Sequence, residues 1–291
     1  MFHVKQKSNF QIKRVDIIRQ ICYNHAVEMT ERMTCMGKII AVTNQKGGVG
    51  KTTTTVNLSA ALAEARKKVL LVDMDPQGNA TSGVGVDKDE TENTVYEMLL
   101  GEASYEDCVI ETEFKNLWVL PANIDLSGLE IDILEVKDRE YLLKNILESV
   151  RDSFDFILID CPPSLNMLTI NSLCAADSAL VPIQCEYYAL EGLSQLLHTV
   201  ALVQDKLNPE LKVEGIVFTM YDGRTNLSAQ VVENVKENLD HKIFKTVIPR
   251  NVRLAEAPSH GMPIMAYDPT STGATRYRLL AAEIIRNRKS K

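Results

Sequence analysis

A glycine-rich loop between an expected strand and an expected helix constrains this chain more than any other feature. Residues 38–43 are a β-branched run, and a helical pattern of apolar residues follows Thr52. Between them stands the run Lys46-Gly47-Gly48-Val49-Gly50-Lys51-Thr52-Thr53. Glycines let backbone N–H groups turn towards phosphate oxygens, and the start of a helix adds partial positive charge. The order of strand, loop and helix therefore predicts a phosphate-binding loop.

The lysines and the first threonine of this loop have separate expected roles. Lys51 is expected to reach the β- and γ-phosphates of a nucleotide, and the Thr52 hydroxyl to hold Mg²⁺. The ordinary motif would have glycine at position 45, but Gln45 stands there and Lys46 adds a second lysine. The alternative is a glycine-rich turn with two solvated lysines, and the agreement of strand, loop and helix argues against it.

Acidic residues end two other expected strands. The apolar run at 69–72 is followed by Asp73 and Asp75, and the run at 154–159 is followed by Asp160. In an open α/β sheet, ligands bind beyond the carboxyl ends of the strands. We therefore expect Asp73 and Asp75 to orient an attacking water or to approach Mg²⁺, and Asp160 to hold the Mg²⁺ shell through water. The alternative for each is an acid that only caps a helix or ends a strand.

Expected strands alternate with expected helices along the chain. Further strands are expected at 116–121, 177–183, 213–220 and 242–248. Helices are expected at 94–100, 138–150, 190–207, 228–239 and 273–288. This alternation predicts an α/β fold with one doubly wound, mainly parallel sheet flanked by helices.

Composition limits the classes of protein that remain. The 291 residues, 45% of them hydrophobic, suit one large α/β domain or two smaller ones. With a net charge of −7, nucleic-acid binding would need a local basic patch. No run is long and apolar enough to span a bilayer. The six cysteines show no C-x-x-C spacing, so we expect reduced thiols in a cytosolic protein, with an iron–sulfur role for Cys161 as the alternative.

Five separated segments together resemble the ParA/Soj family of chromosome-partitioning ATPases, with a P-loop of the deviant Walker A type found in the ParA/MinD superfamily. They are residues 44–53, 73–81, 160–164, 184–192 and 247–259. The resemblance covers about residues 36–288. It implies that Lys46 is the signature lysine, that Asp75 is needed for hydrolysis, and that Asp160 is the Walker B acid.

The resemblance also implies ligands and an assembly. It implies ATP and Mg²⁺ as cofactors, slow and partner-stimulated hydrolysis to ADP and phosphate, and a homodimer that holds two nucleotides between its subunits. Lys46 would reach the phosphates of the other subunit, and Pro249 and Asn251 would cradle adenine. Arg224 matches a family arginine that binds double-stranded DNA without sequence preference, and Arg253 is a weaker candidate. The alternative for both arginines is a solvated or ion-paired side chain.

A partner protein and a location follow from the same resemblance. The partner would be a ParB/Spo0J-type centromere-binding protein. The protein would be cytoplasmic and associated with the nucleoid, and it would not bind a membrane. A phosphate-binding loop of this type also occurs in other classes, so three rivals are kept. They are a MinD-type regulator with a membrane-binding final helix, an ATP-coupled enzyme of the cobyrinate-amidase or nitrogenase-iron-protein type, and a non-catalytic DNA-binding module.

The first 35 residues differ from the rest. They carry a net charge of +3, and the apolar core of a signal peptide is missing. We expect residues 1–35 to be an extension that is disordered, loosely docked or the product of a misassigned start, and residues 36–291 to be the ATPase domain. Residues 1–6 can be encoded by ATG TTT CAC GTG AAA CAA, whose core TTTCACGTGAAA is a palindrome that resembles the centromere-like sites of this family. Our hypothesis is translated regulatory DNA, and other codons at His3 and Val4 would exclude it.

Overall fold

The computed structural model describes residues 36–186 and 189–289, so the predictions for residues 1–35 lie outside the described part. Its strands form one sheet in the order β3-β4-β2-β5-β1-β6-β7, in which every pair except β3–β4 is parallel. The strands are β1 (Lys38–Val42), β2 (Val69–Asp73), β3 (Ile110–Glu111), β4 (Leu117–Leu120), β5 (Phe156–Asp160), β6 (Ser178–Gln184) and β7 (Lys212–Thr219). The predicted mainly parallel, doubly wound sheet is confirmed.

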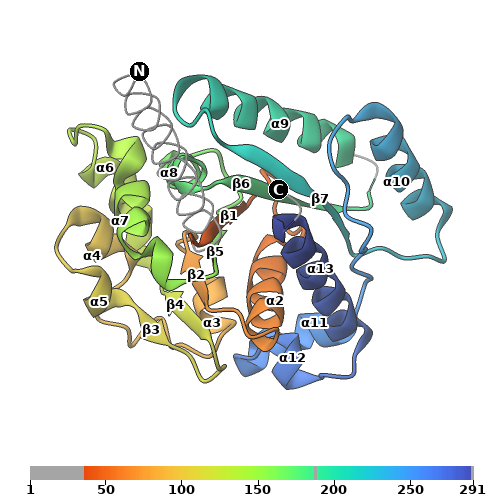
Figure 1. The fold of residues 1–291 in the computed structure, drawn as a ribbon, viewed down its shortest axis with the longest axis horizontal. Coiled ribbons are helices and arrows are strands. Elements are labelled where there is room, and N and C mark those ends of the chain that lie inside the picture. The colour runs from red at the N-terminus through yellow and green to blue at the C-terminus, as the bar shows by residue number, and fades with distance from the viewer. Residues whose placement is uncertain (1–35, 187–188, 290–291) are drawn as a thin grey trace, which may run out of the picture. The chain divides into compact units, whose positions relative to one another are not determined.

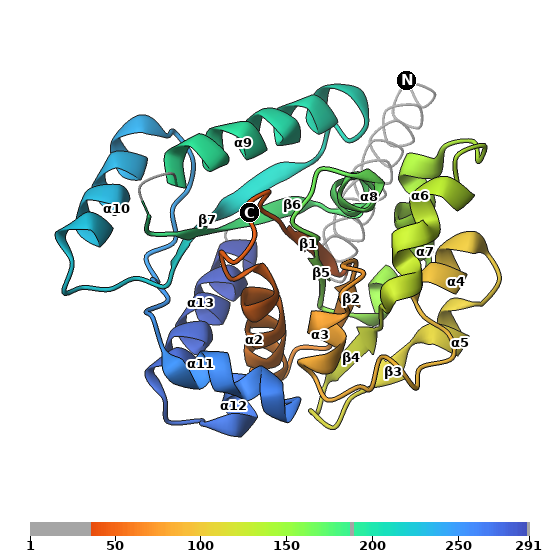
Figure 2. The same cartoon turned by 180° about the vertical axis from the view of Figure 1, so that it is seen from behind.

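Helices cover both faces of this sheet (Figure 1, and Figure 2 from behind). The α-helices are α2 (Lys51–Glu64), α3 (Asn79–Ser82), α4 (Val95–Leu100), α5 (Tyr105–Cys108), α6 (Leu129–Asp132), α7 (Leu142–Val150), α8 (Met167–Ala175), α9 (Ala189–Lys206), α10 (Asn226–Asn238), α11 (Val252–Glu256), α12 (Ile264–Tyr267) and α13 (Thr272–Lys289). Short 3₁₀ turns are η1 (Ile124–Gly128), η2 (Arg139–Tyr141), η3 (Arg151–Ser153) and η4 (Ala257–His260). None of the described helices is both long and apolar enough to cross a membrane.

The central strand β1 shows how the sequence builds two cores. Ile39 and Ala41 belong to the core beneath α7, α8 and α9, whereas Ile40 and Val42 belong to the core beneath α2 and α13. Successive side chains of a strand point to opposite faces, so a strand covered on both faces must be apolar throughout. The final helix α13 contributes buried side chains to the second core.

The strand predicted at 242–248 is wrong. This segment makes only isolated bridges, Ile216 with Ile243 and Tyr221 with Pro249. The backbone N–H groups of residues 245 and 246 donate to the Glu283 carboxylate of α13, at 3.1 and 3.0 Å. These donors are satisfied by a helix and not by β7, so a continuous ladder does not form. The sequence also gave no sign of the short antiparallel strand β3.

The topology brings the loops with the expected chemistry to one edge of the sheet. β1 lies between β5 and β6, and β5 lies between β1 and β2. In register, Asp73 at the end of β2 is the neighbour of Asp160 at the end of β5. The loop that follows β1 begins beside them, because parallel strands end at the same edge.

Candidate active site

The loop between β1 and α2 has the backbone conformation that a phosphate cradle needs. Gly48 and Gly50 have φ angles of 74° and 86°, in the left-handed region that glycine adopts without strain. Gly50 is the N-cap of α2 and offers no side chain to the first-turn N–H groups of the helix. No capping side chain accepts from these N–H groups, so they remain available to an anion in the loop.

Lys51 is held inside the loop. It is only 7% exposed, and its Nζ donates to the Lys46 carbonyl at 3.2 Å. Burial lowers the pKa of Lys51, while Asp160, Cys161 and Asp75 oppose that shift. The cation is thus partly desolvated and close to both predicted acids, so an anionic ligand gains a strong interaction there.

Lys46 lies differently from Lys51. Its side chain is 39% exposed, and its Nζ makes an ion pair with Glu186 Oε2 at 2.9 Å. Its backbone N–H donates to the Asn44 side chain at 3.0 Å. The second lysine of the loop therefore rests on the rim of the site, against the segment that follows β6.

Asp160 is fully buried, as is Asp73. The Asp160 Oδ1 accepts from the Thr55 hydroxyl at 2.8 Å, and Thr52, like Thr55, acts to lower its pKa. Its Oδ2 is buried and has no hydrogen-bond partner within the described residues. Burial, followed by repulsion from Asp73, raises the pKa of Asp160. An orphaned carboxylate oxygen beside a threonine hydroxyl suits a divalent cation, whose preferred ligands are oxygens.

Asp73 and Asp75 have separate structural roles. Asp73 accepts from the Thr81 N–H and hydroxyl, both at 2.8 Å, and from the Asp75 N–H at 3.1 Å, so it fixes the loop after β2. Burial raises the pKa of Asp73, and Thr81 opposes the shift. Asp75 is 8% exposed, and within the described residues its Oδ1 accepts only from the Gln77 N–H, at 3.0 Å. Asp75 is therefore the acid that keeps capacity for another ligand.

A pocket of about 220 Å³ adjoins the loop. Gly50 and Thr53 line it together with Pro249 and Asn251, which are some 200 residues away in sequence. Asn251 caps α11, since its side-chain oxygen accepts from the Arg253 N–H at 2.8 Å. The remaining lining residues are Thr219, Met220, Ile248, Arg250, Leu254, Ala255 and Tyr277. A largely apolar pocket beside a phosphate loop is suited to a nucleotide base.

The two predicted DNA-binding arginines lie outside this pocket. Arg224, in the loop between β7 and α10, is 87% exposed at its side chain and makes two hydrogen bonds to Asp222, at 2.9 and 2.7 Å. These bonds hold the pKa of Asp222 well below its usual range. Arg253 pairs with Glu256 at 2.9 Å and with Asp268 at 3.6 Å. Arg253 is therefore the more fully neutralised of the two.

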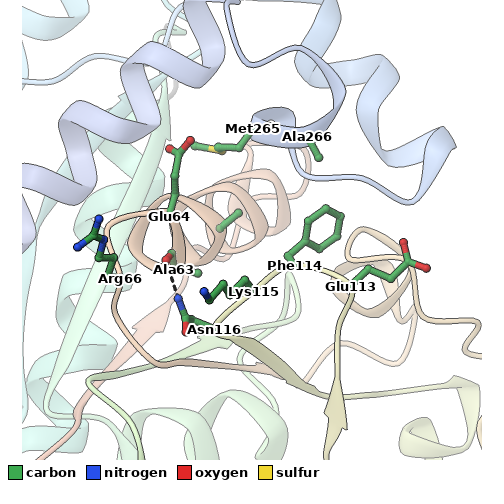
Figure 3. A pocket seen from close by; sticks show the side chains of 10 residues that line it. Ala63, Glu64, Arg66, Glu113, Phe114, Lys115, Asn116, Met265 and Ala266 are labelled. Carbon is green, nitrogen blue, oxygen red and sulfur yellow. Dashed lines mark hydrogen bonds between the residues drawn. The ribbon is translucent and has the colours of Figure 1, made fainter.

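The larger pocket of about 770 Å³ lies at the other end of α2, away from the loop (Figure 3). Phe114 points into it, and Asn116 donates across one side to the Ala63 carbonyl at 3.4 Å. Glu64, on its wall, is already paired with Arg278 at 2.6 Å. This pocket holds no glycine loop and no helix start, so it does not suit a phosphate.

Several residues of the site were not predicted. The Thr55 hydroxyl donates to Asp160, Glu186 pairs with Lys46, and the Thr81 hydroxyl donates to Asp73. Met220 and Tyr277 line the pocket beside the loop. The threonine run after Lys51 is a signal that could have pointed to Thr55, because residues 51 and 55 share one face of a helix. The others come from distant segments, and their positions depend on tertiary structure.

Comparison with known proteins identifies the family. Residues 37–213 match the family model described as an AAA domain. The sporulation initiation inhibitor protein Soj of Bacillus subtilis is 59% identical over 252 residues, which cover 87% of this chain and 100% of that protein. The chromosome-partitioning ATPase Soj of Treponema pallidum is 53% identical, covering 86% of this chain and 98% of that protein. The chain belongs to the Soj/ParA family of chromosome-partitioning ATPases.

Solved structures agree with this Soj/ParA assignment at the level of the fold. A cobyrinic acid a,c-diamide synthase from Mycobacterium smegmatis, crystallised with ADP and magnesium, is similar with a TM-score of 0.79 and 41% identity, covering 88% of this chain and 96% of that one. The cell division ATPase MinD of Pyrococcus furiosus is similar with a TM-score of 0.73 and 32% identity, covering 87% and 100%. The deviant P-loop ATPase fold expected from the sequence is confirmed.

Proposed function

We propose that this Soj/ParA family ATPase dimerises when it binds ATP, binds DNA without sequence preference as a dimer, and drives partitioning with a ParB/Spo0J-type partner on the nucleoid. The observation that carries the proposal is the juxtaposition of a glycine cradle, a desolvated Lys51 and a buried Asp160 with one unpartnered oxygen. Together they suit a triphosphate with its cation, because a buried, unpaired carboxylate is costly unless a cation compensates it.

The residues of the site divide the work of hydrolysis. Loop N–H groups and Lys51 hold the phosphates, and Thr52 and Asp160 hold Mg²⁺, directly or through water, with Asp75 close by. When bound, Mg²⁺ supplies positive charge that offsets the charge of the phosphates. Asp75 orients the attacking water, for which its lightly bonded carboxylate has the capacity. Pro249 and Asn251 hold the adenine.

Dimerisation is supported by what lies on the rim of the loop. The Lys46–Glu186 pair is an exposed ion pair, and such pairs contribute only about 0–1 kcal/mol. Lys46 therefore leaves Glu186 at little cost when the triphosphate of a second subunit is offered. Leu165 is 43% exposed and lies two residues beyond Pro163. Pro163 lies beside Gly47 of the loop, because a side chain added at Gly47 would place its Cβ 4.0 Å from the Pro163 Cβ. An exposed apolar side chain so close to the loop favours burial against a second copy.

DNA binding is assigned to Arg224, with Arg253 as the second candidate. Arg224 is almost fully exposed, and in the part of the chain that the structure describes only Asp222 pairs with it. Exchanging that carboxylate for a DNA phosphate costs little for the same reason. A dimer carries two such arginines, and two linked weak contacts bind much more tightly than one. This explains how a protein with a net charge of −7 binds a polyanion.

The other classes have less support. Relatives named Soj reach 59% identity, against 41% for the cobyrinic acid diamide synthase. A MinD-type membrane-binding function would require α13 to detach from the domain. Tyr277, Leu280 and Ile284 of α13 are instead buried in the core with α2. Liposome sedimentation with ATP would reveal such a membrane activity directly.

A DNA pull-down with ATP, ADP or no nucleotide tests the proposal. The wild-type chain should bind random-sequence DNA only with ATP, and Lys51→Ala should not bind under any condition. Size-exclusion chromatography of the same samples should show a dimer with ATP alone. Equal DNA binding in all three states would contradict the nucleotide switch.

A further inference from the structure

Met220, at the end of β7, has a backbone conformation that its residue type rarely adopts. Its φ is 50°, in the left-handed region. Among the described residues, the other non-glycine positions with positive φ are Arg66, Asn116 and Asp138. Asn and Asp tolerate this region through short polar side chains, but methionine has no such compensation. Met220 is therefore strained.

Hydrogen bonds on both sides of Met220 hold it in this conformation. The Thr219 hydroxyl donates to the Val49 carbonyl of the phosphate loop at 2.7 Å. The Tyr221 N–H donates to the Ile248 carbonyl at 3.1 Å, and the Tyr221 carbonyl accepts from the Arg250 N–H at 3.0 Å. The chain is thus fixed to the loop just before Met220 and to the base-pocket segment just after it.

The strained residue faces the pocket of about 220 Å³ beside the loop. Ile248, Pro249, Leu254 and Tyr277 line this pocket with Met220. Non-glycine residues persist in strained conformations where the surroundings over-determine them, and such residues cluster at ligand sites. A methionine thioether makes favourable contacts with aromatic rings.

We infer that Met220 is a specificity-determining residue of the nucleotide site, whose strained turn places its side chain against the purine base. The inference rests on the proposed function, since it takes ATP as the ligand. The phosphates are held elsewhere, by the loop and Lys51. Removing the Met220 side chain should therefore weaken the binding of ATP without weakening the binding of a ligand that consists of phosphates only.

Three substitutions of Met220 separate its strain from its contact with the base. Met220→Gly removes both, Met220→Ala removes the side chain but keeps the strain, and Met220→Leu keeps a side chain of similar size. Arg66→Gly is the matched control, because Arg66 also has a positive φ, of 63°, but lies at the far end of α2. The measurements are thermal unfolding without nucleotide and calorimetric binding of ATP, CTP and tripolyphosphate.

We expect Met220→Gly to raise the melting temperature by about 2–4 °C and to weaken ATP binding by about tenfold. Tripolyphosphate binding should be unchanged, and the selectivity for ATP over CTP should fall. Met220→Ala should lose ATP affinity to the same extent without the rise in melting temperature. Met220→Leu should bind ATP within about threefold of the wild type. Arg66→Gly should gain stability and bind ATP normally.

Two results would overturn the inference. One is a Met220→Gly variant that binds ATP as tightly as the wild type. The other is an equal loss of ATP and tripolyphosphate affinity, which would show general loosening of the loop. Failure of the wild-type chain to bind ATP would be a different result, because it would contradict the proposed function itself.

Discussion

The floor and the rim of the phosphate loop hold charge in different ways. On the floor, Lys51 and Asp160 are buried, and their pKa values are shifted by desolvation. On the rim, Lys46 and Glu186 are paired but remain 39% and 47% exposed. A buried charge is costly to leave without a partner, whereas an exposed pair exchanges partners cheaply. The floor is therefore built for one ligand, and the rim is free to change partners.

Lys51→Ala should give the largest effect, because it removes the cation of the floor. Losing charge-assisted hydrogen bonds in a desolvated site should weaken ATP binding on the order of a hundredfold. Calorimetric titration with ATP and Mg²⁺ measures this. Lys46→Ala is the control, and a similar loss of monomer affinity in both variants would erase the contrast between floor and rim.

Asp75→Ala should separate binding from hydrolysis. We expect ATP affinity to stay near the wild-type value and the hydrolysis rate to fall on the order of a hundredfold, because a positioned base or water-orienting group contributes that much. The ATP-bound dimer should then persist on DNA. Phosphate release measured with and without DNA tests the effect, and an unchanged rate would remove Asp75 from the mechanism.

Arg224→Ala tests whether the exposed surface acts through phosphate contacts. DNA affinity should fall by about tenfold, and the slope of log affinity against log salt should shrink by about 1.8 for a dimer, at about 0.9 per phosphate contact. ATP-dependent dimerisation should be retained. An unchanged salt slope would assign DNA binding to another surface, with Arg253→Ala as the next variant.

Asp160→Asn should change how stability depends on pH in the absence of nucleotide and Mg²⁺. The pKa of Asp160 is raised above its usual 3.8 in the folded state. The contribution of Asp160 to stability is therefore fully present below the unfolded-state pKa of 3.8, and it is lost as pH rises through the folded-state pKa. The melting temperature of Asp160→Asn relative to the wild type should increase between about pH 4 and pH 8. A difference that is constant with pH would contradict the shift.

Glu186→Gln should give the smallest effect. It releases Lys46 from an exposed pair worth at most about 1 kcal/mol, so ATP-dependent dimerisation should strengthen by no more than about fivefold. Glu191→Gln, also after β6, is a surface control. Sedimentation at several protein concentrations measures the change, and a large loss of dimer would mean that Glu186 belongs to the buried class instead.

How far the sequence predicted this molecule depended on whether a feature was local. The β-branched run at 38–43 and the apolar runs at 69–72 and 154–159 predicted β1, β2 and β5, because a strand covered on both faces must be apolar along its length. The same reasoning failed at 242–248, where Glu283, about 40 residues away, accepts from the backbone N–H groups of Lys245 and Thr246. No short-range pattern specifies that contact.

The candidate site divides in the same way. The glycines, Lys51 and Thr52 are neighbours in the chain, so their grouping in one loop could be predicted from the sequence. The contact of Lys46 with Glu186 spans 140 positions. The left-handed turn at Met220 leaves no mark in composition, since methionine is not a residue type that signals it. The orphaned oxygen of Asp160 likewise emerges only from the packing around it.

The base pocket joins Gly50 and Thr53 to Pro249 and Asn251, and this has a consequence during synthesis. During translation the phosphate loop leaves the ribosome long before the residues from Thr219 to Tyr277 that line the rest of the pocket are synthesised. The lining of the pocket is complete only after Tyr277 of α13 has emerged. On the proposed assignment of the base to this pocket, nucleotide is a ligand of the finished polypeptide, and it stabilises the last stage of folding and not the first.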